Sequence, residues 1–199
     1  MTDIQTQLGT HIYHLCFAHS EAEALQAEQG IRQSIRQGAN PNLLTDIARE
    51  IAIPVELLVD PYGANPPNAS RALKVLMEHD TLELSGAREA LEGLTPLQHA
   101  AINAFDIPGS DDSMKILRLL ANDPRVDLNE KFGPNTVLPE AEGMTILECL
   151  KTPEYDYPDY LVKAVEDAEK ARVIAARSGQ SPASVFPAAA SREQGPLAR

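Results

Sequence analysis

The sequence predicts an all-α protein built from short antiparallel helix pairs, and three observations lead to this expectation. Hydrophobic residues make up 43% of the 199 residues, yet aromatic residues make up only 5% and Trp is absent. Burial must therefore come from Leu, Ile, Val and Ala, which suits closely packed small helices better than a β-sandwich. The other two observations are helical periodicity in several segments and the recurrence of one helix-pair pattern along the chain.

The clearest copy of this pattern covers residues 93–129. It reads GLTPLQHAAINA, then an interruption FDIPGSDD, then SMKILRLLANDPRVDLN. Thr95 is placed to cap a first helix that has Pro96 at its first position, where the missing amide is tolerated. After the interruption, Ser113 is placed to cap a second helix, with Asp111 and Asp112 favourable at its positive end. The buried stripe of the second helix is Ile116, Leu117, Leu119 and Leu120.

This unit resembles the ankyrin repeat. Its opening, Thr95 to Ala100, is similar to the family's Thr-Pro-Leu-His-x-Ala, with Gln98 where the family has His. Its second half is similar to the family's Leu-Leu-to-Asn closing segment, which ends here at Asn129. The resemblance implies a solenoid of antiparallel helix pairs with extended connectors, in which several loop insertions lengthen the period.

Three weaker copies flank this unit. Gly38-Ala39-Asn40-Pro41-Asn42 is similar to the closing segment of a first repeat, with Gly38 expected as the left-handed residue that ends the preceding helix. We expect the first helix of this repeat at about residues 10–19, with His14 at the family's His position. A second copy has Leu73, Leu76 and Met77 on its outer helix, but several Pro residues between 54 and 67 break its inner half. The last copy opens at Gly143, and its outer helix is expected from Pro158 to about Arg177.

The predicted domain organisation follows from these copies. We expect an ankyrin-repeat domain over residues 1–178, with repeats at about 9–42, 43–86, 91–129 and 143–178. Residues 179–199 are rich in Ala, Pro and Ser without periodicity, which predicts a disordered tail.

The net negative charge limits the kinds of molecule that the chain is expected to bind. The chain has 17 Lys and Arg against 29 Asp and Glu, a formal net charge of -12, which would repel a nucleic acid backbone. The acidity either serves solubility or favours a basic partner. The N-terminal segment lacks a basic and apolar signal pattern, and no apolar run approaches the roughly 20 residues of a membrane helix, so a cytoplasmic protein without membrane association is expected. Cys16 and Cys149 have no metal-binding spacing and are expected to be reduced thiols.

The sequence offers little for catalysis. His11, His14, Cys16 and His19 are close together, but no nearby Asp or Glu completes a metal-ligand set. Asp106, Asp111 and Asp112 lack the alternate spacing of a calcium loop. No phosphate-binding loop, nucleophile elbow or zinc-protease helix is present. We therefore expect no enzyme activity, no cofactor and no metal.

The resemblance implies a protein-binding scaffold that uses its concave face, connector tips and loop insertions. It places partner contacts at Leu91, Glu92, Leu94, Ile102 and Asn103 in the clearest repeat, and at Ala141, Glu142, Met144 and Thr152 in the last. Their apolar and acidic character indicates a partner with an apolar patch edged by basic residues. Tyr155, Tyr157 and Tyr160 either contact the partner or wedge the last helix in place; Tyr155 and Tyr157 are kept as contact candidates.

Two other functions compete with a general adaptor. One is an acidic inhibitor or immunity-type protein that occludes a basic enzyme, and the other is a bacterial effector that acts in the host cytosol, with the C-terminal tail as its signal. The insertions and the Pro-rich loop are the candidates for specificity because they add loop entropy without adding core. The sequence does not identify the partner, the source organism or the oligomeric state.

Overall fold

The computed structural model describes residues 3–47, 50–59, 66–106, 111–134 and 136–178. This part of the chain is mostly helical, with one two-stranded sheet, so the expected all-α class is confirmed at this level. The predicted disordered tail, residues 179–199, lies outside the described residues. So do residues 107–110 of the FDIPGSDD interruption and residues 60–65 of the Pro-rich loop.

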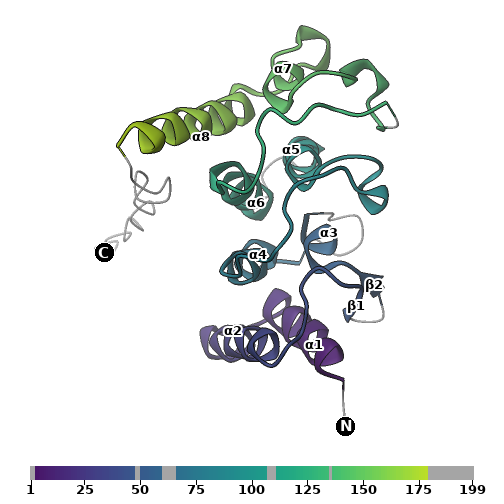
Figure 1. Cartoon of the computed structure of the whole chain (residues 1–199), viewed down its shortest axis with the longest axis vertical. Helices are drawn as coiled ribbons and strands as arrows, with labels where there is room; N and C mark the ends of the chain where they lie inside the picture. The colour runs from purple at the N-terminus through teal and green to yellow at the C-terminus, as the bar shows by residue number, and fades with distance from the viewer. Residues whose placement is uncertain (1–2, 48–49, 60–65, 107–110, 135, 179–199) are drawn as a thin grey trace, which may run out of the picture.

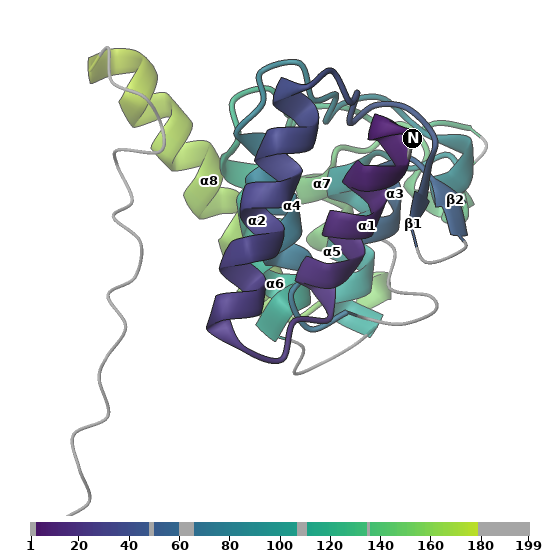
Figure 2. The same ribbon diagram turned by 90° about the horizontal axis from the view of Figure 1, so that it is seen from below.

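The helices pack in consecutive pairs. Contacts join α1 with α2, α3 with α4, α5 with α6 and α7 with α8. Figure 1 shows the pairs stacked in two rows, an outer row of α2, α4, α6 and α8 and a connector-side row of α1, α3, α5 and α7. The bounds are α1 Ile4–Cys16, α2 Glu21–Arg36, α3 Pro54–Val59, α4 Ala69–Met77, α5 Pro96–Asp106, α6 Asp111–Asn122, α7 Ile146–Leu150 and α8 Asp159–Ser178. Seen from below, α8 extends beyond the other helices (Figure 2).

Three connectors extend on the side of the connector-side row (Figure 1). The first, residues 37–53, contains the antiparallel strands β1 Thr45–Ile47 and β2 Glu50–Ala52. The second, residues 79–95, and the third, residues 123–145, are each closed by one antiparallel bridge and contain the 3-10 helices η1 Glu89–Leu91 and η2 Pro139–Ala141. A further 3-10 helix, η3 Pro153–Tyr155, precedes α8.

Two glycines close the second and third connectors in the same way. Gly93 has φ 79° and Gly143 has φ 78°, a left-handed conformation that a side chain would strain. Gly93 N donates to Arg88 O, and Gly143 N donates to Phe132 O, each at 2.9 Å. The equivalent turns bring each chain segment back to the start of the next helix.

The starts of α5 and α7 use the same capping interaction. Thr95 Oγ1 accepts a hydrogen bond from Gln98 N at 3.2 Å, and Gln98 Oε1 accepts one from Thr95 N at 3.0 Å. Thr145 and Glu148 form the corresponding pair. The predicted cap at Thr95 is confirmed. Gln98 also donates to Glu130 O at 3.2 Å, which ties α5 to the third connector.

The expected position of the first helix was wrong. α1 begins at Ile4 and ends at Cys16, because the chain must turn before Ser20, whose side chain caps α2 by accepting from Glu23 N. His14 is consequently exposed and does not occupy an interior hydrogen-bonding position. Gln5 instead joins α1 to the first connector, donating to Asn40 O at 2.8 Å and accepting from Asn40 N at 3.0 Å.

The expected helix cap at Ser113 was also wrong. α6 begins at Asp111, so Ser113 lies inside the helix and is buried. Asp112 is in the first turn of α6 but accepts a hydrogen bond from Ser70 N at 2.8 Å and one from the Ser70 hydroxyl. It therefore stabilises the start of α4, one pair earlier. By contrast, the predicted outer helix of the second copy is confirmed, with Leu73 and Leu76 buried in α4.

Two arginines join successive outer helices through backbone carbonyls. Arg125 donates to Met77 O and His79 O at the end of α4, at 2.9 and 2.6 Å. Arg172 in α8 donates to Ala121 O, Asp123 O and Val126 O, each at 2.6 Å. The last carbonyls of a helix have no partner within the helix, so each arginine stabilises one helix end and one helix-pair interface together.

The two thiols should be unreactive in the folded protein. Cys16 and Cys149 are buried and not in a disulfide, and burial raises their pKa to about 12 and about 11. Because the thiolate is the reactive form, we expect iodoacetamide at about pH 8 to label neither residue in the native chain and both after unfolding in guanidinium chloride. Mass spectrometry of the two labelled samples checks this. Labelling of the native protein at the rate of the unfolded one would contradict the burial.

Candidate protein-interaction surface

The outward face of the first connector carries exposed apolar side chains. In the β1 and β2 register, Asp46 lies opposite Ile51 and Thr45 lies opposite Ala52. Side chains alternate between the faces of a strand, and Thr45 and Ile47 are buried. Asp46 and Ile51 therefore share the other face, where Ile51 is 70% exposed, and Leu44, which directly precedes β1, is 64% exposed. We call these three residues the hairpin face.

The hairpin is held close to α1 because Gly9 has no side chain. A Cβ atom at Gly9 would lie 2.1 Å from Asp46 O and 2.9 Å from Asp46 C. The backbone of β1 therefore packs directly on the helix, and this contact fixes the direction in which the hairpin face points. The apolar side chains of that face are presented by a supported element.

A shallow groove lies next to the end of β2. It is lined by Ile53, which directly follows β2, by Glu56 of α3, and by Arg88, Glu89 and Ala90 of the second connector. Glu56 and Arg88 form an ion pair at 3.2 Å, and their side chains are only 10% and 11% exposed. We call this the connector groove.

The ion pair in the connector groove is anchored to the backbone. Arg88 Nη2 donates to Glu83 O at 2.8 Å, and Arg88 N donates to Leu94 O at 3.0 Å. Arg88 Nε is buried without a hydrogen-bond partner. Removing either Glu56 or Arg88 would leave a buried charge unpaired, so both side chains serve as a fixed base for the groove.

Charge is distributed unevenly between the connectors and the outer row. The described parts of the connectors carry eight exposed carboxylates and one exposed cation, Lys131. The carboxylates are Asp46, Asp80, Glu83, Glu89, Glu92, Asp127, Glu140 and Glu142. The outer row holds ten of the 17 cationic residues: Arg32, Arg36, Arg71, Lys74, Lys115, Arg118, Lys163, Lys170, Arg172 and Arg177. The connectors therefore form an acidic surface with apolar side chains within it.

Three predicted contact residues, Leu91, Leu94 and Asn103, have buried side chains, so in this structure they are not exposed to a partner. Leu91 and Leu94 have 0% and 1% exposure, because the turn between them directs both side chains into the core. Asn103 is buried in α5, where its Nδ2 donates to Val59 O at 2.6 Å and lies 2.8 Å from His99 Nδ1. These side chains support the helices beneath the connectors.

The other predicted contacts differ in exposure. Glu92 and Glu142 are exposed on the second and third connectors, whereas Ile102 and Met144 are half-buried and pack against the core. Of the further contact positions, Ala141 is buried and Thr152 is half-buried. Of the contact positions that the resemblance implies in these two segments, only Glu92 and Glu142 are exposed.

Tyr157 packs against α5, and Tyr155 packs against Tyr157. The Tyr157 ring meets Phe105 edge-on with ring centroids 4.9 Å apart, and the Tyr155 and Tyr157 centroids are 5.6 Å apart. Both residues are half-buried, and the Tyr155 hydroxyl is buried without a hydrogen-bond partner. This favours the wedge interpretation for both; Tyr160 remains 43% exposed on α8.

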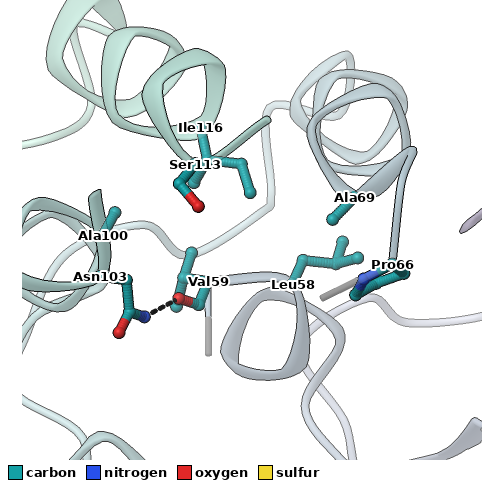
Figure 3. Close-up of a pocket in the computed structure, with 8 residues that line it drawn as sticks. All are labelled: Leu58, Val59, Pro66, Ala69, Ala100, Asn103, Ser113 and Ile116. Carbon is teal, nitrogen blue, oxygen red and sulfur yellow. Dashed lines mark hydrogen bonds between the residues drawn. The ribbon is translucent and has the colours of Figure 1, made fainter. Parts of the chain in front are cut away.

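The enclosed space among α3 to α6 is too small for an organic ligand. A cavity of about 10 Å³ is lined by Leu58, Val59, Pro66, Ala69, Ala100, Asn103, Ser113 and Ile116 (Figure 3). This volume accommodates about one water molecule.

The described residues contain no group of three or more His, Cys, Asp or Glu side chains that could bind a metal ion. Among the helices of the described chain, none has the length and apolarity to cross a membrane.

No family model, curated protein or solved structure matches this chain. The candidate surface is therefore defined by its geometry. Leu44, Ile51 and Ile53 could not be expected from the repeat pattern, because residues 43–67 depart from it. The alternation of Ile51 and Ile53 just before Pro54 is the signal that could have indicated a strand with one apolar face.

Proposed function

We propose that this protein is an ankyrin-type, non-enzymatic module that binds a partner protein through the hairpin face and the connector groove. The observation that carries the proposal is the exposure of Leu44 and Ile51 on a hairpin held firmly against α1. Exposed apolar groups gathered on a supported element, with polar residues around them, are typical of protein contact sites.

Recurring contacts support the ankyrin-type assignment. Asn42 Nδ2 donates to Thr81 O at 2.7 Å, and one pair later Ser85 Oγ donates to Arg125 O at 2.8 Å. Burial recurs at matching positions of the closing segments: Ala39, Leu82 and Val126 are buried, and so are Pro41, Leu84 and Leu128. The successive pairs are therefore joined by similar bonds at similar positions, as expected for a repeat array.

The chemistry of the surface indicates the chemistry of the partner. The hairpin face includes the exposed carboxylate Asp46, and further exposed carboxylates lie on the second and third connectors. A partner with an apolar patch edged by Lys or Arg would bury the apolar side chains of the hairpin face and neutralise these carboxylates. An acidic inhibitor of a basic enzyme is a second candidate that the same carboxylates favour. The delivered-effector hypothesis depends on residues 179–199, which lie outside the described residues.

Partner capture with matched variants tests the proposal. The full chain, the double variant Leu44→Ser and Ile51→Ser, and the control Leu25→Ser and Val173→Ser are used as baits in a native lysate. Leu25 and Val173 are also exposed, at 47% and 46%, but lie on the outer row. We expect one protein to be retained by the unchanged chain and by the control, and its affinity for the hairpin-face variant to fall about 10-fold to 100-fold.

Two results would contradict the proposal. Equal retention of the partner by the hairpin-face variant would place the contact elsewhere, and loss with the outer-row control would show that the outer helices bind it. Circular dichroism of each variant confirms that the helical content is unchanged. If the retained protein is a basic enzyme and loses activity in the complex, the inhibitor function is the correct one.

A further inference from the structure

We propose that the connector groove binds a Lys or Arg side chain of an extended partner segment, while neighbouring apolar side chains of that segment lie on the hairpin face. This inference rests on the proposed function and specifies the chemistry of the partner. It makes the groove the site that selects a cation and the hairpin the site that adds apolar contact.

The charge of the groove favours a cation. Glu56 and Arg88 neutralise one another at 3.2 Å, whereas Glu89 on the rim is exposed. The groove therefore carries one uncompensated negative charge. An anionic ligand would meet Glu89 and would have to compete with Glu56 and Glu83 O for the Arg88 guanidinium. A cation meets Glu89 directly and leaves the buried pair intact.

The walls of the groove suit the aliphatic part of a basic side chain. Ile53 lines one part and Ala90 another. Lys and Arg bury their methylene chains along apolar surface while their charged ends stay near water or a carboxylate. The methylene chain of the basic residue would contact Ile53 and Ala90, and its charged end would meet Glu89. These three are the side chains that the groove exposes.

The hairpin face suits the rest of an extended segment. Ile53 follows β2 directly and lines the groove, so the groove lies two residues along the chain from the exposed side chain of Ile51. Alternate residues of an extended chain point to the same side, about 7 Å apart. A segment with a cation at one position and an apolar residue two positions away can therefore occupy the groove and contact Ile51 together.

A second copy of this chain fits the surface less well. Its own connectors carry the same carboxylates and would repel the acidic surface. The cations of its outer row are partly engaged within the chain, since Arg32 pairs with Glu28 and Glu78 and Arg71 pairs with Glu21 and Glu28. The favoured occupant is a basic and apolar segment of another protein.

Selection of peptides provides the test. Random 12-residue peptides displayed on phage are panned against the full chain. The best peptide is then measured against Glu89→Lys and against the control Glu169→Lys, which reverses the same charge on exposed α8. We expect selected peptides to carry Lys or Arg with Val, Ile or Leu two positions away. The dissociation constant of the best peptide should rise at least about 10-fold for Glu89→Lys. For Glu169→Lys it should stay unchanged.

Amide chemical shifts locate the bound peptide. Shifts are expected at Ile51, Ile53 and Ala90, and affinity should fall as salt is added. Selected peptides without basic residues, equal binding to Glu89→Lys, or shifts confined to the outer row would overturn the inference. Self-association of the chain that blocks the groove in sedimentation would also overturn it, since a second copy would then be the occupant.

The two proposals can fail separately. If the Leu44 and Ile51 variant loses its captured partner but Glu89→Lys retains it and no basic peptide is selected, the interaction function stands and the cation site does not. If the Leu44 and Ile51 variant retains its partner at full affinity, the interaction function itself is wrong.

Discussion

Replacement of Gly9 by Ala should destabilise the protein by about 2 to 3 kcal/mol, because the added Cβ overlaps backbone that cannot move independently. The Cβ would lie 2.1 Å from Asp46 O and 2.8 Å from Thr45 Cγ2. Ala is a better helix former than Gly by about 1 kcal/mol, so helix propensity alone would predict the opposite sign. The clash outweighs it because either α1 or β1 must shift along its length. Urea denaturation followed by circular dichroism measures the change in the free energy of unfolding.

Gly133→Ala is the matched control for Gly9→Ala. No atom lies within 4 Å of a Cβ built at Gly133, and its φ lies outside the left-handed region. That change should leave stability within about 0.5 kcal/mol of the unchanged chain. A neutral result for Gly9→Ala would show that β1 is not packed directly on α1. If α1 or β1 shifts to relieve the clash, the hairpin face moves with it. Gly9→Ala should therefore also weaken retention of the captured partner.

Replacement of Arg172 by Ala should destabilise the protein by about 2 to 4 kcal/mol. The guanidinium donates to three backbone carbonyls at the end of α6 and in the chain that follows, each at 2.6 Å. Asp123 O also accepts a hydrogen bond from Val126 N at 3.1 Å and keeps that partner in the variant. Each buried acceptor that does lose its partner costs about 1 to 3 kcal/mol, and access of water to this half-buried site reduces the total. Hydrogen exchange should show faster exchange in α8 and at the end of α6. Chemical denaturation measures the overall loss.

Two further variants separate hydrogen bonding from charge. Arg177→Ala removes an exposed cation from the same helix and should change stability by less than about 0.5 kcal/mol. Arg172→Lys keeps the charge but cannot reproduce the planar, multiple donation, so it should remain clearly destabilised. Full stability of Arg172→Lys would mean that charge alone joins α8 to α6.

Gly9 and Arg172 stabilise opposite ends of the stack of helix pairs. Gly9 sets the closeness of the hairpin to α1, and Arg172 holds the terminal helix against its neighbour. A binding surface assembled from three connectors requires that the pairs beneath them keep their spacing. We therefore expect variants that loosen the stack to weaken partner binding without changing any surface residue.

The sequence by itself predicted features that depend on local chemistry. The cap at Thr95, the left-handed glycine at Gly38, and the outer helices α4 and α8 are examples, with α8 displaced by one residue from its expected start. Such features follow from side-chain capping, from backbone conformational freedom and from helical periodicity, all of which act within a few residues.

Features decided by contacts distant in sequence were found only in the tertiary structure. Whether Leu91 or Ile51 is exposed depends on which way a turn and a strand register point their side chains, and a shift of one residue exchanges the two faces. That register is set by the approach of β1 to Gly9, 37 residues earlier than Asp46. The predicted all-α chain of helix pairs therefore stands in its coarse form. The surface that we propose for partner binding was decided by packing between segments that no local pattern relates.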